Sequence, residues 1–539
     1  MALPNDSKKP GNERPSPERE ESAEEWVPSA NPWLIAISVM LATFMEILDT
    51  SIVTVALPHM AGSLGATTDQ ATWVVTSYLV SNAIVLPSTA WIAGRFGRKR
   101  SLMVCIVLFT LSSFLCGAAN NLGLLILARV AQGAGGGALQ PLSQAILLES
   151  FPPHRRGAGM AFFALGVVVA PVVGPTLGGW ITDSYSWRWL FYINIPVGIA
   201  ALLMIQRFVE DPWYIRHGGP RRIDLVGFGL LAIGLATLQI ILDKGQQADW
   251  FGASWVRWFA VIAGLALVSF VFWELRFPAP VVNLRILKNR NFALGTLLII
   301  LVGVIIYSPL TLLPEFLQTL RGFPALQSGL AQSPRGLGAL LMTPVVGYLS
   351  GRIDARRLIL IGFLAAGCSI FLFGNINLDV GIGSIALPNF LQGMAMSMIF
   401  IPLSTISTGN LPREQIGSGT GIYNLMRNLG GGIGISVVTT LLARRAQTHQ
   451  TILAAHLTPY DAAFQAQLHS LQGAFSTHVG SVLAAQQSLA VSYNLTVRQA
   501  TLLAYIDNFR WLALVSLVCL ATAIFLKKVP PHSPGAIAH

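Results

Sequence analysis

Two carboxylates, Glu46 and Asp49, lie three positions apart in the stretch LATFMEILDTSIVTVALP, which is otherwise uncharged and mostly apolar. On a helix, residues three apart share one face, about 60° from each other. A charge at membrane depth costs at least about 2.5–3.5 kcal/mol, so it usually marks a functional site. Two neighbouring acids away from water suit a site that takes up and releases a proton near neutral pH. The alternative is a structural acid paired with an arginine or a backbone donor, and Asp49 is the stronger functional candidate.

A further charged residue, an arginine, lies in another apolar stretch. Arg129 lies about two turns inside another apolar segment, with Gln132 three residues later. A buried arginine must be paired or face water. Arg129 is therefore either a functional residue or one half of a fixed ion pair between helices.

Membrane-spanning helices must hold these residues. The chain of 539 residues is 53% hydrophobic and only 11% charged, whereas soluble domains are about a quarter charged. Apolar runs of about 18 or more residues recur, long enough to cross a hydrocarbon core of about 30 Å, whereas a β-barrel would show short alternating segments. We therefore expect an all-α polytopic membrane protein with fourteen transmembrane helices. Their expected positions are 33–57, 72–93, 101–119, 122–147, 158–182, 189–206, 224–242, 256–273, 292–316, 328–350, 358–375, 383–408, 416–443 and 508–526.

Basic residues predict how these helices are oriented. Short loops rich in Lys and Arg follow the even-numbered helices, for example Arg95, Arg98, Lys99 and Arg100 after the second. The intervening loops carry few basic residues. The positive-inside rule therefore places both termini in the cytoplasm, which agrees with an even number of spans. This distribution explains the net charge of +11 without nucleic acid as a partner.

A repeat indicates two related halves. AGRFGRKRSL (93–102) and SGRIDARRLIL (350–360) both place Gly-Arg at the inner end of an even-numbered helix, before a basic cluster and another span. Transporters with repeated halves bind substrate near the midplane, between the halves. The first residues are rich in Pro, Glu, Ser and Lys, which predicts disorder. The expected parts are a disordered cytoplasmic tail (1–31), a six-helix half (32–206), two linker helices (207–291), a second six-helix half (292–527) and a cytoplasmic tail (528–539).

One outer loop, residues 444–507, is unusually long and rich in Ala and Gln, with apolar residues at helical spacing. We expect one or two amphipathic helices there, either as a surface cap or as a docking surface for a partner.

An ordered set of motifs runs across nearly the whole chain and includes LDTSIVTVALP (48–58), GRFGRKR (94–100), RVAQGAGGG (129–137), APVVGPTLGGW (170–180) and LMRNLGGGIG (425–434). This set resembles the fourteen-helix drug:H⁺ antiporters of the major facilitator superfamily, the EmrB/QacA type, and is most similar to EmrB-like members. One position departs from the family pattern, because Gly94 stands where the family usually has an acid. The charge-relay role of that acid therefore cannot be transferred.

The resemblance implies a major facilitator fold that exports hydrophobic drugs or toxic small molecules across a bacterial inner membrane. Export would be driven by the proton gradient, without a cofactor, through alternating access of the two halves. The resemblance gives Arg129 a role in proton coupling, with an acid of the first span as its partner. It also implies a periplasmic adaptor (EmrA-like) and an outer-membrane channel as partners, with 444–507 as the docking candidate. The alternative is a dedicated proton-coupled exporter of one metabolite, siderophore or fatty acid.

The remaining candidates surround the expected cavity and the moving helices. Arg427, in mid-span, could meet an anionic substrate or an acid, and Glu315 lies either on an exit path or at the membrane interface. Asn82, Tyr307 and Gln132 are expected to line or support the cavity. Glycines at four-residue spacing permit close helix approach and prolines bend helices, so their segment is interpreted as an antiporter hinge, as tight packing, or as both. The expected conformational motifs are Arg95, Gly97, Arg98, Gly166, Pro171, Gly174, Pro175, Gly178 and Gly179.

The sequence does not favour an enzyme. The glycine-rich stretches 133–138 and 430–434 lie inside apolar spans without a preceding strand, so they are not dinucleotide fingerprints. There is no Gly-Lys-Ser/Thr phosphate loop and no His-Glu-x-x-His set in the sequence. The four cysteines all lie in apolar segments and are interpreted as small hydrophobic residues, not as metal ligands or disulfides.

Overall fold

The computed structural model describes residues 28–152, 155–211, 224–278, 280–350, 352–408, 411–455, 457–477 and 479–526. Within these ranges every regular element is a helix. Residues 1–27 and 527–539 lie outside them, so the two predicted tails stay predictions. Part of the predicted linker region, residues 212–223, also lies outside the described residues.

Thirteen helical segments of the described chain are long and apolar enough to cross a membrane. A further helix, α16 (Ser333–Leu349), has 17 residues and lies where the sequence predicts a span at 328–350, so the count of fourteen stays a prediction. The thirteen are α1 (Pro32–Ser63), α3 to α4 (Trp73–Phe96), α5 (Arg98–Ala118), α6 to α7 (Leu122–Ser150), α8 (Arg156–Ser184), α9 to α10 (Trp189–Phe208), α12 (Leu225–Lys244), α13 (Ser254–Arg276), α14 (Arg290–Thr319), α17 (Ala355–Phe373), α18 (Ile382–Thr408), Gln415–Ala454 of α19 (Arg413–Ala454) and α21 (Ser481–Ala523).

Three of these segments contain internal breaks. In the segment Trp73–Phe96, Pro87 lacks an amide hydrogen to donate, and a short 3₁₀ turn interrupts the helix there. The pieces are α3 (Trp73–Val85), η2 (Leu86–Ser88) and α4 (Thr89–Phe96); α6 (Leu122–Gly136) and α7 (Leu139–Ser150); and α9 (Trp189–Tyr192) and α10 (Asn194–Phe208). The shorter elements are α2 (Thr68–Ala71), η4 (Trp250–Gly252), η5 (Leu284–Lys288), α15 (Ala325–Leu330) and α20 (Ala462–Ser476).

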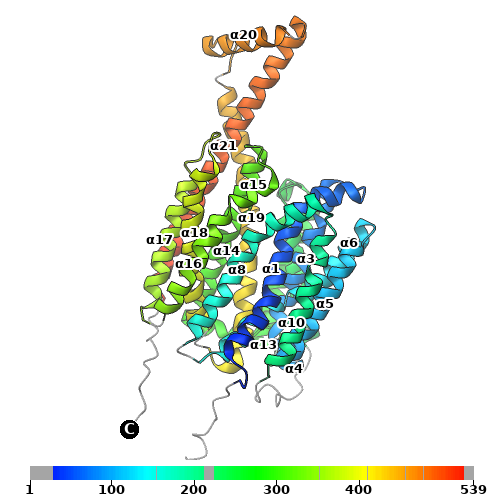
Figure 1. Cartoon of the computed structure of the whole chain (residues 1–539), viewed down its shortest axis with the longest axis vertical. Helices are drawn as coiled ribbons and strands as arrows, with labels where there is room; N and C mark the ends of the chain where they lie inside the picture. Colours follow the sequence, from blue (N-terminus) through cyan, green and yellow to red (C-terminus); the bar gives the residue numbers. More distant parts are fainter. Residues whose placement is uncertain are drawn as a thin grey trace, which may run out of the picture.

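A few helices join the two halves of the bundle (Figure 1). From the first half, α8 packs along α16 and α18 of the second, while α19 packs against α7, η2 and α4. The contact between α8 and α16 is close at one end, where a Cβ on Gly347 would lie 3.1 Å from the Cβ of Ala161. The linker helices α12 and α13 pair with each other, and α12 lies against α3. The residues between the halves therefore come from both repeats.

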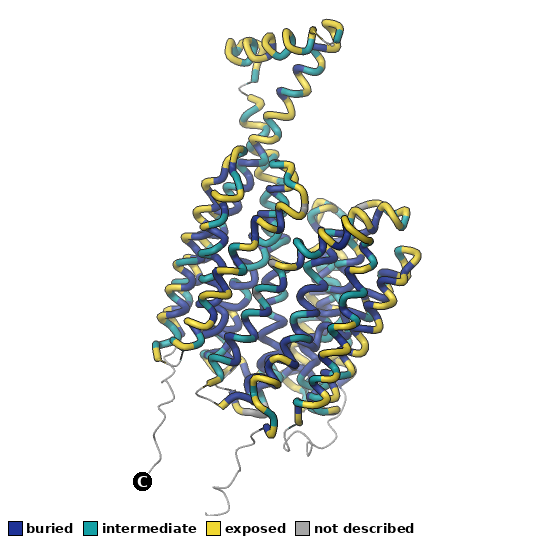
Figure 2. Tube along the Cα trace, viewed as in Figure 1, coloured by how far each residue is buried: buried dark blue, intermediate teal, exposed yellow. Residues whose placement is uncertain are grey.

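The last helices differ from the sequence prediction in length. The sequence places their membrane spans at 416–443 and 508–526, but α19 continues to Ala454 and α21 already begins at Ser481. The segment Ser481–Ala523 contains neither Gly nor Pro, and its Ala, Leu and Gln residues are good helix formers. Both helices therefore project beyond the bundle, where α20 connects them (Figure 1). Most residues of this helical extension (444–507) are exposed or partly exposed (Figure 2).

Candidate functional site

Asp49 lies on α1 at the centre of a closed polar cluster within the first half. Arg129 Nη1 donates to Asp49 Oδ2 at 2.6 Å, and both side chains are fully buried. Two amides donate to Asp49 Oδ1, Gln132 Nε2 at 2.9 Å and Asn194 Nδ2 at 2.8 Å. The guanidinium of Arg129 also donates through Nε to the carbonyl of Val74 at 3.0 Å. Asp49 therefore connects helices α1, α6 and α10 through one ion pair and two amide hydrogen bonds.

Glu46 lies one helical turn earlier and has a different set of partners. Tyr78 Oη and Asn82 Nδ2 donate to Glu46 Oε1 at 3.1 and 3.2 Å. Gln140 Nε2 donates to Oε2 at 2.5 Å. Each of these donors is uncharged. Glu46 is therefore buried without an ion pair among the described residues.

Tyr78 on α3 joins the two clusters. Its hydroxyl donates to Glu46, while its ring lies 4.2 Å from the guanidinium carbon of Arg129. A cation over an aromatic face is stabilised by the ring quadrupole, and more strongly when it is desolvated. Tyr78 thus contacts both the carboxylate of Glu46 and the guanidinium group that pairs with Asp49.

A chain of side chains leads from Glu46 into the second half. Gln140 on α7 donates to Glu46 and accepts, through Oε1, a hydrogen bond from Nη2 of Arg427 on α19. Arg427 is 1% exposed. Nearby, Asn424 of α19 donates to Gln144 of α7 at 2.6 Å. The side-chain amide of Gln140 therefore links the carboxyl group of Glu46 directly to the second half.

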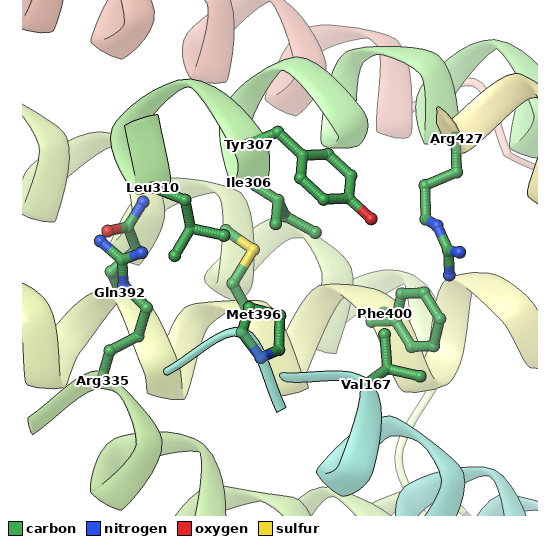
Figure 3. A pocket seen from close by; sticks show the side chains of 10 residues that line it. Val167, Ile306, Tyr307, Leu310, Arg335, Gln392, Met396, Phe400 and Arg427 are labelled. Atoms are coloured by element: carbon green, nitrogen blue, oxygen red, sulfur yellow. The ribbon is translucent and has the colours of Figure 1, made fainter. Parts of the chain in front are cut away.

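A narrow cavity lies beside this chain, between the halves (Figure 3). It encloses about 30 Å³, room for two or three water molecules, so a drug-sized molecule enters only when the halves move apart. Arg335 and Gln392 lie at one end in this view, and Arg427 and Phe400 at the other. The lining residues are Val167 and Pro171 of α8, Ile306, Tyr307 and Leu310 of α14, Arg335 of α16, Gln392, Met396 and Phe400 of α18, and Arg427 of α19.

The sequence pattern of the Major Facilitator Superfamily matches residues 39–435 of the chain. The chain belongs to the Major Facilitator Superfamily. Its members are membrane transporters, so this protein is a multi-pass transporter and not an enzyme. The chain is 39% identical to the multidrug export protein EmrB of Haemophilus influenzae, over 84% of this chain and 89% of that protein. It is 36% identical to EmrB of Escherichia coli K12, over 93% of this chain and 96% of that protein. The resemblance to EmrB-like members is confirmed.

Solved structures agree on the fold. The human organic anion transporter MFSD10 has a TM-score of 0.57 at 16% identity, over 90% of this chain and 99% of that one. The proton:xylose symporter XylE has a TM-score of 0.58 at 14% identity, over 92% of this chain and 96% of that one. The all-helical facilitator fold predicted from the sequence is therefore confirmed.

The structure brings most of the predicted site residues of this transporter together. Glu46, Asp49, Arg129, Gln132 and Asn82 form the two clusters on and around α1, while Tyr307 and Arg427 line the cavity. Glu315 is not among the residues that line this cavity. It is half-buried on α14, two helical turns beyond Tyr307, so its role on an exit path stays a prediction.

The superfamily's loop after the second span is built around Gly97 and Arg98. Gly97 has a φ angle of +86°, a backbone conformation that favours glycine. A Cβ atom added to Gly97 would lie 2.5 Å from the Asp211 carboxylate, so the site has no room for a side chain. Asp211 Oδ1 accepts a hydrogen bond from the backbone N–H of Lys99 at 2.8 Å. Arg98 forms a buried ion pair with Glu149 of α7. Arg95 is exposed.

The antiporter-type segment of α8 packs closely on α1. An ideal Cβ on Gly166 would lie 1.5 Å from Met40 Cε, and one on Gly174 would lie 2.3 Å from Ser51 Oγ. Ser51 Oγ donates to the carbonyl of Pro171 at 3.1 Å. The tight-packing interpretation therefore has direct contacts, whereas a hinge role stays a prediction. Pro171 and Pro175 lie inside the helix, and Gly178 and Gly179 are buried.

Several residues of the site were not found from the sequence. Gln140 and Asn194 are uncharged amides inside apolar spans, which also occur for purely structural reasons. Arg335 carried a clear signal, because it is an ionisable residue within a predicted span. Asn194 completes the Asp49 cluster, Gln140 connects the halves, and Arg335 lines the cavity.

Proposed function

We propose that this transporter is a proton-coupled antiporter that exports hydrophobic drugs across a bacterial inner membrane by alternating access. The relatives named as multidrug export proteins support the drug class. The buried acids of α1 support proton coupling, because a charge at this depth needs a functional or structural reason. The hydrogen-bonded chain from Glu46 through Gln140 to Arg427 carries the proposal, because it connects a buried acid to the cavity between the halves.

In this proposal Glu46 takes the proton and Asp49 holds the site together. Protonation of Asp49 would break its ion pair and leave Arg129 charged and buried, which is strongly unfavourable. Protonation of Glu46 breaks no ion pair. It weakens the hydrogen bond from Gln140, and so it loosens the contact with Arg427. The proton thereby changes the interaction between the halves, which is what an antiporter requires of its coupling site.

The proposed orientation has both termini in the cytoplasm. Basic residues of the loops cluster at the end of the bundle where α1 begins, and this follows the positive-inside rule. The helical extension (444–507) then projects into the periplasm. Its length beyond the bundle and its exposed surface (Figures 1 and 2) support it as the contact for a periplasmic adaptor, which in turn would reach an outer-membrane channel.

A second candidate function is export of one dedicated compound, such as a fatty acid, a siderophore or another metabolite. One observation favours the fatty acid. The chain is 36% identical to the fatty acid resistance protein FarB of Neisseria gonorrhoeae, over 93% of this chain and 97% of that protein.

Proton release from the purified protein in detergent tests the proposal. A hydrophobic uncoupler-type compound is added in weak buffer, and a pH-sensitive dye reports the protons released. We expect wild type to release protons on binding, and Glu46→Gln to bind the compound without release. Arg321→Gln is the matched control, because Arg321 donates to backbone carbonyls of Leu378 and Val380 away from both clusters.

Three outcomes separate the possibilities. Normal release by Glu46→Gln combined with loss in a folded Asp49→Asn variant would move the proton to Asp49. Normal release by both variants would place the coupling site elsewhere in the bundle. Binding without any release by wild type would contradict the antiporter itself.

A further inference from the structure

Two buried arginines face the cavity without a carboxylate partner. Arg335 is 3% exposed and Arg427 is 1% exposed. Across the described ranges, no acidic side chain lies within 4.0 Å of either guanidinium group. This contrasts with Arg98 and Arg129, which both have acidic partners. A buried charge without a counter-ion is unfavourable, so the cavity favours an occupant that brings a negative charge.

Arg335 is anchored on one side only. Its Nη2 donates to Asn389 Oδ1 of α18 at 3.0 Å, while Nε and Nη1 have no hydrogen-bond partner in the part of the chain that the structure describes. Asn389 in turn donates to two backbone carbonyls, of Ala331 and Ile385. The guanidinium group is therefore positioned by a fixed amide, with the rest of its donors available to a ligand.

The surroundings of Arg335 fit an amphipathic molecule. Gln392 lies beside it in the cavity (Figure 3), 1% exposed and with its Oε1 unpartnered among the described residues. The wall between the two arginines is apolar and comes from α14 and α18. It consists of Ile306, Leu310, Met396 and Phe400, with the ring of Tyr307.

Arg335 and Arg427 have different tasks. Arg427 donates to Gln140 and is therefore part of the chain that leads to Glu46. Arg335 has no described contact with that chain. We propose that Arg335 binds the acidic group of a lipophilic anion carried in the cavity, while the apolar wall holds the body of that molecule. This inference rests on the proposed export function and names the kind of substrate that the cavity selects.

The chemistry of the guanidinium group supports this assignment. Arginine stays charged even when buried, and its hydrogen bonds to carboxylates or phosphates are charge-assisted and roughly twice as strong as neutral ones. A buried guanidinium group therefore discriminates between an acid and the matching neutral amide. An apolar wall alone favours the neutral amide, because burying an unpaired carboxylate costs more desolvation energy than burying an amide.

A matched pair of ligands tests the inference. We would measure binding of 2-naphthoate and 2-naphthamide to the purified full-length chain by isothermal titration calorimetry at pH 7.5. Wild type should bind the naphthoate at least tenfold more tightly. Arg335→Gln should weaken naphthoate binding about tenfold or more and change naphthamide binding less than twofold. Arg335→Lys, which keeps the charge, should retain part of the preference, and Arg321→Gln should keep all of it.

Each other outcome has a definite meaning. Equal binding of both ligands by wild type would overturn the inference without any variant, so it can be tested even if Arg335→Gln fails to fold. A preference that survives in Arg335→Gln would place the acidic group elsewhere. Equal weakening of both ligands would make Arg335 a support of the cavity wall only. If wild type prefers naphthoate but releases no proton on binding a drug, the antiporter proposal fails and the role of Arg335 stands.

Discussion

Glu46 and Asp49 lie on the same face of α1, one helical turn apart, yet their surroundings are opposite in kind. Asp49 is closed in by a buried arginine and two amides of its own half. Glu46 has neutral donors, and one of them, Gln140, reaches the other half. The difference shows that two buried acids one turn apart can have unlike partners. In the proposed mechanism, these partners decide which acid holds helices together and which one changes its charge.

The largest expected effect comes from Asp49→Asn. This change leaves Arg129 buried without a counter-charge, and breaking a buried pair from one side costs about 3–5 kcal/mol. We expect the free energy of unfolding, measured by SDS titration in mixed micelles, to fall by about that amount. Glu46→Gln should lower it by less than about 1 kcal/mol, since an amide can keep some of the same neutral partners.

The double variant Asp49→Asn/Arg129→Gln is the control for this result. Removing both charges should restore part of the lost stability, because no unpaired charge remains. If Glu46→Gln destabilises the protein as strongly as Asp49→Asn, both acids hold the helices together to the same extent.

Asn194→Ala should have the next largest effect on stability. Asn194 donates to Asp49 at 2.8 Å and to Ser113 Oγ at 3.0 Å, and a hydrogen bond to a charged group is worth about 1.5–3 kcal/mol. We expect a loss within that range, measured in the same titration, with proton release on drug binding still intact. Loss of proton release with unchanged stability would instead give the Asp49 cluster a direct part in coupling.

Gln140→Met should separate binding from coupling. Methionine has a similar volume but cannot connect Glu46 with Arg427, so the chain between the halves is cut. We expect proton-driven drug export in proteoliposomes to fall about tenfold, which corresponds to about 1.4 kcal/mol of coupling, while drug affinity in detergent stays within a factor of two. Unchanged export would show that another contact carries the coupling. Asn424→Ala, which breaks the neighbouring bond to Gln144, is the matched control.

A small effect is expected for Asn82→Ala as well. Asn82 gives Glu46 one neutral hydrogen bond at 3.2 Å, and such a bond contributes about 0.5–1.5 kcal/mol. Stability should fall by about that much, and the protein should still exchange protons, because Tyr78 and Gln140 remain. A loss as large as that of Asn194→Ala would contradict the comparison between the two clusters.

Much of the fold could be predicted from sequence because the bilayer imposes a simple length requirement. The predicted spans at 33–57 and 101–119 lie within a few residues of α1 and α5. The ends of α19 and α21 could not be predicted in the same way. Hydropathy reports the length of an apolar segment, whereas these helices continue beyond the bundle (Figure 1).

The site was predictable only where a charge carried a large cost. Glu46, Asp49 and Arg129 were found on that ground, and the structure joins the last two as an ion pair. The difference between the two acids depends on Asn194 and Gln140, which are distant in sequence and uncharged. A single sequence holds no physical signal that assigns one amide to Asp49 and the other to Glu46, because this choice depends on how the helices cross.

The continuity of α19 has a mechanical consequence. The helix carries Arg427 at the cavity and continues to Ala454 in the extension without a break, so the distance between these residues along its axis is about 40 Å at about 1.5 Å per residue. A stiff rod of that length works as a lever arm. A tilt of about 10° at the cavity moves its far end by roughly 7 Å. A pair of fluorescent labels, one on the extension and one at the Leu122 end of α6, would thus report motion at the cavity from a distance.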